Sequence, residues 1–93
     1  MEKVIINAEV VHCKDGSQFI GASCLGKDLP KSLNTPKGTD FIKYHIRFNG
    51  LDSNKLEPGR YEVEYSDIYM DERPEFITKM IVRLTPYTIV KIL

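Results

Sequence analysis

The fold is decided by the stretch LEPGRYEVEY at residues 56–65, in which a Pro-Gly turn runs directly into strict alternation. Tyr61, Val63 and Tyr65 share one face of the strand that this alternation predicts, and the residues between them are charged. A period of two residues is typical of a half-buried strand. One side of this strand is therefore expected to face a core and the other side to face water.

Other alternating or apolar segments flank this strand, and no segment carries a helical period over three turns. Pro86 interrupts the last apolar stretch and is expected to end one strand before another begins. The predicted strands cover residues 3–12, 18–25, 41–48, 60–70, 76–84 and 87–93. Together they predict an all-β fold, a small five- to six-stranded antiparallel barrel that is OB-fold-like, in a single domain over residues 1–93.

The first two strands are expected to form a hairpin around the turn KDGS at residues 14–17. With Asp-Gly at the centre of a two-residue turn, paired residue numbers sum to 31, so Phe19 is expected opposite His12. Cys13 and Cys24 then lie far apart on the ladder. Reduced, structural cysteines are therefore favoured over a disulfide or a reactive nucleophile.

Residues 26–40 form a long connection with two prolines, two glycines and no periodicity. Connections of this length are commonly functional or disordered. The segment contains a turn signal at residues 35–38 and is weakly basic. Two interpretations stay open, a mobile solvated loop and a functional loop.

Composition excludes several classes of function. Among 93 residues, 13 Lys and Arg balance 13 Asp and Glu, so any polyanion must be held by a local basic face. No catalytic motif, phosphate-binding loop or zinc-ligand spacing occurs, so we predict no enzyme, no metal and no small-molecule cofactor. The N-terminus has no apolar signal region and no stretch reaches membrane-spanning length. We therefore expect a cytoplasmic protein that does not bind membranes.

Three short signals occur in an order that points to a family. They are the basic hairpin tip KDGSQF at residues 14–19, the strand entry PGRYEV at residues 58–63 and the closing RLTP at residues 83–86. In order and spacing they resemble the filamentous-phage gene V type of single-stranded DNA-binding proteins. The resemblance implies an OB-fold homodimer that binds single-stranded nucleic acid during replication of a phage or mobile element.

The resemblance also assigns roles to residues at matching positions. It implies Lys14 at the basic hairpin tip, Phe19 as a base-stacking aromatic, and Arg47 and Arg83 as cations along the nucleic-acid backbone. From our own reading of the residues we add three neighbours to this set: Lys43, Phe76 and Lys79. Single-strand binding needs this combination, because cations neutralise phosphates and each stacked base contributes about 1–3 kcal/mol.

The chain departs from the family's pattern in its long 26–40 connection, its last apolar strand and its acidic turn at residues 71–75. These departures leave a second function open, a non-enzymatic protein-interaction module that docks through Ile89, Val90 and Ile92 or through the 26–40 loop. The nucleic-acid function requires the predicted cations to share one concave face on which Phe19 is accessible.

Overall fold

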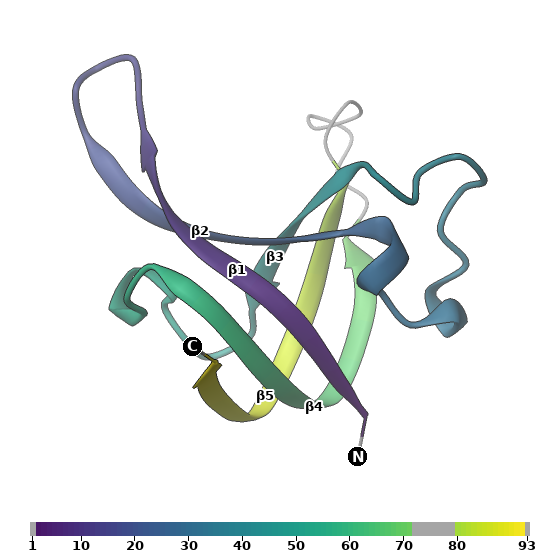
Figure 1. Ribbon diagram of the computed structural model, residues 1–93. Coiled ribbons are helices and arrows are strands. Elements are labelled where there is room, and N and C mark those ends of the chain that lie inside the picture. Colours follow the sequence, from purple (N-terminus) through teal and green to yellow (C-terminus); the bar gives the residue numbers. More distant parts are fainter. Residues whose placement is uncertain (1, 72–79, 93) are drawn as a thin grey trace.

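Five strands close into a barrel in the computed structural model, which describes residues 2–71 and 80–92 (Figure 1). They are β1 (Lys3–His12), β2 (Gln18–Leu25), β3 (Lys43–Phe48), β4 (Gly59–Asp71) and β5 (Ile81–Ile92). Around the barrel the order is β1-β2-β3-β5-β4, and β4 pairs with β1 to close it. The predicted all-β, OB-fold-like barrel is confirmed. Its one departure from an antiparallel arrangement is the parallel pair of β3 and β5.

The barrel is filled by one alternating row from each strand. On β4 this row consists of Tyr61, Val63 and Tyr65, as the opening stretch of sequence predicted. The tyrosine rings are buried, while the Tyr61 hydroxyl donates to the backbone oxygen of Glu57 at 2.7 Å and the Tyr65 hydroxyl to Glu2 Oε2 at 2.7 Å. The other strands contribute Val4, Ile6, Ala8, Ala22, Cys24, Tyr44, Ile46, Val82 and Leu84.

The β1–β2 hairpin projects from the barrel as an arm (Figure 1), and its register differs from the predicted one. Cys13 N–H donates to Ser17 O at 2.9 Å and Gly16 N–H to Cys13 O at 3.1 Å, and Gly16 has a φ of 87°. This is a three-residue loop with a left-handed glycine rather than a two-residue turn. Phe19 therefore pairs with Val11, and the predicted pairing with His12 is wrong by one residue.

Pro86 does not end a strand, so the prediction of two separate strands around it is wrong. β5 is continuous from Ile81 to Ile92, and Pro86 lies opposite Tyr65 at a place where the β4 register is irregular on both sides. A bulge of this kind tolerates a residue that has no N–H to offer the ladder. The predicted beginning of this strand, residues 76–79, lies outside the described residues.

The 26–40 connection is built from two single-turn 3-10 helices, η1 (Gly26–Asp28) and η2 (Lys31–Leu33). Leu29 and Thr39 are buried, so these two side chains are not part of a solvated loop. β3 begins only at Lys43, later than predicted. A third 3-10 turn, η3 (Ser53–Lys55), lies between β3 and β4. No helix in the described part of the chain has the length and apolar character needed to cross a membrane.

Candidate nucleic-acid interface

The basic row predicted on the third strand lies on the outer face of the barrel. Lys43, His45 and Arg47 are exposed, because they alternate with residues that fill the core. β5 runs parallel to β3 and places Arg83 in register beside Arg47. Two arginines that the sequence separates by 36 positions therefore become neighbours on adjacent strands.

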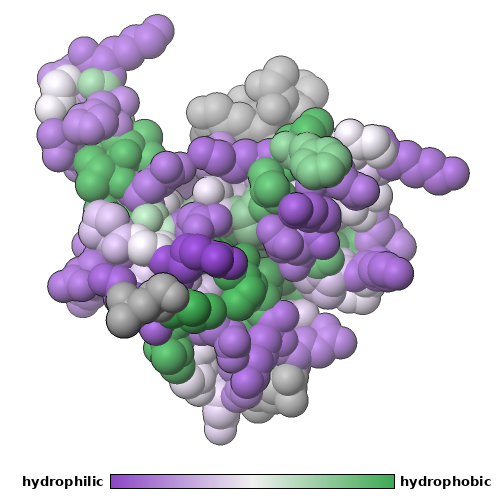
Figure 2. Space-filling view, in the orientation of Figure 1, coloured by the Kyte–Doolittle hydropathy of each residue, from purple (hydrophilic) through white to green (hydrophobic). Residues whose placement is uncertain are grey.

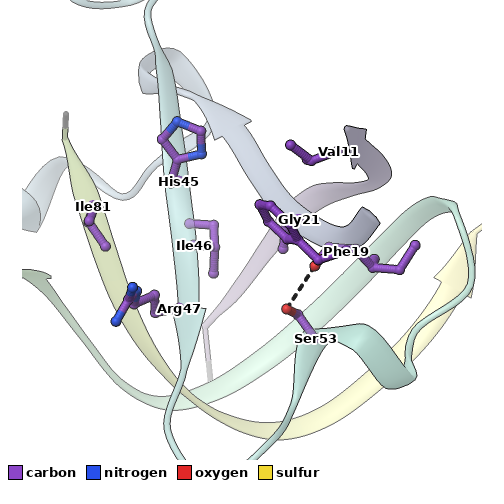
Figure 3. Close-up of a pocket in the computed structure, with 10 residues that line it drawn as sticks. Val11, Phe19, Gly21, His45, Ile46, Arg47, Ser53 and Ile81 are labelled. Carbon is purple, nitrogen blue, oxygen red and sulfur yellow. Dashed lines mark hydrogen bonds between the residues drawn. The ribbon is translucent and has the colours of Figure 1, made fainter. Parts of the chain in front are cut away.

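A hollow of about 380 Å³ lies on this outer face and is lined by residues of several strands and of η3 (Figure 3). Phe19 and Gly21 come from β2, Arg47 from β3 and Ile81 from β5. We call this hollow the β2–β3 groove. Its full lining is Val11, Phe19, Ile20, Gly21, Ala22, His45, Ile46, Arg47, Ser53 and Ile81.

Phe19 lies at the groove and is 44% exposed, so the requirement of an accessible aromatic is met. The ring is next to Gly21, where a Cβ would lie 3.6 Å from Phe19 Cε2 and 3.0 Å from Val11 Cγ2. The missing side chain at position 21 lets both neighbours approach the strand. Phe19 therefore has packing support within the groove and keeps accessible ring surface.

The cations on this face differ in how far carboxylates neutralise them. Lys43 Nζ lies 2.9 Å from Glu9 Oε1 in an exposed pair, which contributes little and opens readily. Arg83 is held more firmly: its Nη2 lies 2.8 Å from Asp71 Oδ2, and this hydrogen bond raises the pKa of Arg83. Within the described residues, Arg47 makes no hydrogen bond or ion pair. The uncompensated positive charge of the groove therefore belongs to Arg47.

One wall of the groove is held in place by η3, whose part in the site was not predicted from the sequence. Asn54 Oδ1 accepts from Ile20 N–H at 2.7 Å, and the Ser53 hydroxyl donates to Ile20 O at 3.0 Å. These two side chains thus satisfy the backbone N–H and C=O of Ile20, two residues beyond the last β2–β3 pair, Ala22 with Ile46. The sequence signal was the DSN triplet at 52–54, since Asp52 Oδ1 accepts from Asn54 N–H in an Asx turn.

The remaining predicted residues are distributed unevenly. Lys14 is exposed at the tip of the hairpin arm, away from the groove lining. Figure 2 shows a hydrophilic tip on this arm and a hydrophobic patch at its base. Phe76 and Lys79 lie outside the described residues. The structure thus places Phe19 and Arg47 in one groove and Arg83 beside Arg47 on the neighbouring strand, with Lys43 further along β3.

The cysteines are not joined in a disulfide, and the one inside the barrel, Cys24, is buried. Both cysteines are free, and burial, together with the charge of Asp28, raises the pKa of Cys24 to about 12. That thiol stays protonated at neutral pH and is a poor nucleophile. Across residues 2–71 and 80–92, no three side chains of His, Cys, Asp or Glu gather into a possible metal site.

Comparison with known proteins yields no match to a family model, to a curated protein or to a solved structure. The gene V resemblance therefore stays a prediction from the sequence.

Proposed function

We propose that this chain binds single-stranded nucleic acid along the outer face of β2 and β3, with little dependence on base sequence. In the setting that the gene V resemblance implies, the ligand is the single-stranded DNA of a replicating phage or mobile element. This face is where OB-fold barrels commonly bind oligonucleotides. The proposal concerns binding alone and assigns no reaction to the chain.

The observation that carries the proposal is the juxtaposition of Phe19 and Arg47 in one groove. An accessible ring offers a stacking surface to any base, and the Arg47 guanidinium, which lines the same groove, can bind a phosphate of the stacked strand. Arg83, in register with Arg47, adds a second cation. Because Asp71 is paired with Arg83, this second cation contributes only where a phosphate displaces that carboxylate.

Charge balance sets the expected strength of binding. A chain with no net charge gains no long-range attraction, so affinity depends on the few cations at the groove. For two or three phosphate contacts on a single strand, the logarithm of the binding constant should fall with the logarithm of salt with a slope of roughly −1.4 to −2. Binding is therefore expected to be measurable at low salt and weak at high salt.

The test is fluorescence anisotropy with a labelled oligo-dT strand at two salt concentrations. Phe19→Ala should weaken binding by about 5- to 150-fold, the equivalent of about 1–3 kcal/mol. Arg47→Ala should weaken binding. It should also make the slope of the logarithm of the binding constant against the logarithm of salt shallower by roughly 0.7.

Two substitutions serve as matched controls. Tyr87→Ala removes an exposed aromatic from β5, and Arg60→Ala removes an exposed arginine from the outer face of β4. Neither residue lines the groove, so neither substitution should change affinity. Absence of oligo-dT binding at low salt, or equal losses in the groove and control variants, would refute the proposal.

The second candidate function, a protein-interaction module, is favoured by the C-terminal half of β5. Residues 81–84 pair with both β3 and β4, whereas the described register of residues 85–92 is with β4 alone. Tyr87 and Val90 are 66% and 56% exposed on this half, so of the apolar residues predicted there Val90 is the most accessible. An edge strand with such side chains can pair with another chain.

A second copy of this chain is the occupant that can be tested directly. Light scattering over a range of concentrations should then show a homodimer that Val90→Asp disrupts. A monomer at all concentrations would exclude self-association through β5.

A further inference from the structure

We propose that Phe41 and Lys27 form a second base-stacking site. It lies on the β2–β3 face, at the opposite end of that face from the groove. This inference rests on the proposed single-strand binding and extends it. It gives the bound strand a path along β3 with an aromatic ring at each end. We call the pair the Phe41 platform.

Phe41 is the most exposed large apolar side chain among the described residues, with 79% of its surface accessible. Burying such a side chain would stabilise the folded state by about 1.5–3 kcal/mol, and the exposed Phe41 contributes little of this stabilisation. Lys27 Nζ lies over the ring, 5.5 Å from its centroid. A cation at this distance is attracted to the ring face and helps to hold its orientation.

The backbone places this pair at the end of the two strands that carry the groove. Beyond the last β2–β3 register pair, Leu25 with Lys43, Gly26 N–H donates to Ile42 O at 3.0 Å and Lys27 N–H to Asp40 O at 2.9 Å. At about 3.3 Å per residue, the four steps from Lys43 to Arg47 along β3 span about 13 Å, and Phe41 lies in the turn that leads into this strand. Lys43 and His45 lie between Phe41 and Arg47 in the chain and are exposed.

The segment that carries Phe41 is fastened to the barrel. The buried Tyr44 hydroxyl donates to Thr39 Oγ1 at 2.9 Å, and the Thr39 hydroxyl donates to Pro36 O at 2.5 Å. Gly26 lies so close to Thr39 that a Cβ there would meet the Thr39 carbonyl oxygen. An aromatic ring presented from a fixed backbone loses little conformational entropy when a ligand stacks on it.

A nucleobase is the occupant that fits these features. It needs a flat apolar surface, and its phosphate needs a cation within reach, which Lys27 and Lys43 supply. Stacking is tolerant of base identity, in agreement with the sequence-tolerant binding proposed for the groove. A strand long enough to reach both rings would be held by both, and a short strand by one.

The experiment compares oligo-dT strands of about 4 and about 16 nucleotides, lengths that bracket the usual footprint of one OB fold. Phe41→Ala should weaken binding of the long strand by about 5-fold or more and leave the short strand nearly unaffected. Ile42→Ala, at the neighbouring exposed position, is the control and should change neither affinity. Phe19→Ala should weaken binding of both strands.

Direct contact can be read from Phe41→Trp, because the natural chain contains no tryptophan. Stacking should quench the fluorescence of this variant with the long strand and much less with the short one. If wild type binds and Phe19→Ala weakens binding, but Phe41→Ala has no effect and Phe41→Trp is not quenched, the platform is refuted and the groove stands. If wild type binds neither strand, the proposed function and the platform fail together.

Discussion

Replacing Gly26 by Ala should destabilise the protein strongly, although this glycine has no left-handed backbone that would require it. An added Cβ would lie 2.2 Å from the backbone oxygen of Thr39, and that distance must open by about 1.2 Å to reach ordinary contact at 3.4 Å. The shift separates Thr39 from the Tyr44 hydroxyl, its buried hydrogen-bond partner.

The expected magnitude follows from two losses and one gain. Overpacking costs about 1–3 kcal/mol and the strained hydrogen bond about 0.5–1.5 kcal/mol. The lower entropy of the unfolded alanine chain returns only about 0.4–1 kcal/mol. At the midpoints of these ranges a net loss of about 2 kcal/mol remains. It corresponds to a fall in Tm of about 8–16 °C for a domain of this size.

Urea denaturation followed by circular dichroism measures this loss, and Gly21→Ala is the matched control. At position 21 the nearest atom is Val11 Cγ2 at 3.0 Å, the end of a side chain that can move, so the expected loss is below about 1 kcal/mol. Gly26→Ala and Gly21→Ala of equal stability would contradict the close approach of residues 26 and 39.

Three further predictions concern other parts of the barrel. Burial raises the pKa of Tyr65 from 10.0 to about 12, so the unfolded chain releases this proton first. The contribution of Tyr65 to the free energy of unfolding should therefore be complete below about pH 10 and be lost between about pH 10 and pH 12. Urea melts of Tyr65→Phe over the same pH range should lack this loss. Asp71→Asn removes the carboxylate from Arg83, so oligo-dT should bind more tightly with a salt dependence steeper by roughly 0.7; unchanged affinity and slope would count against a role for Arg83. Asn54→Ala leaves Ile20 N–H without its acceptor and should cost about 1 kcal/mol in a urea melt, whereas an unchanged midpoint would show that water replaces the amide.

The local alternation of apolar and polar residues was enough to predict most of the strands. The first two have the predicted bounds, and the alternation of residues 61–65 placed the right side chains in the core. The hairpin register failed because Asp-Gly fits both a two-residue turn and a three-residue loop. The folded chain distinguishes them by the hydrogen bond from Cys13 N–H to Ser17 O and by an Asp15 that is not left-handed, as a two-residue type I′ turn would require. The strand break at Pro86 failed because β5 continues through an irregular pairing with β4, which the sequence around Pro86 alone does not reveal.

The candidate site was predictable only in part, for a related reason. The basic row on β3 could be read from alternation, and Phe19 was accessible as required. The proximity of Arg83 to Arg47 could not be read, because it depends on a parallel pairing between strands far apart in sequence. The role of Asn54 was missed for the same reason, since its partner Ile20 lies 34 residues away.

The position of β5 also bears on how this chain folds. β5 is the last of the five strands to be synthesised, yet it lies between β3 and β4. Until it has left the ribosome, β3 and β4 each present an open edge, and no partial barrel can shield the apolar interior. Folding dominated by such distant pairings commonly takes milliseconds to seconds. The nascent chain is therefore expected to keep the edges of β3 and β4 unpaired until β5 inserts between them.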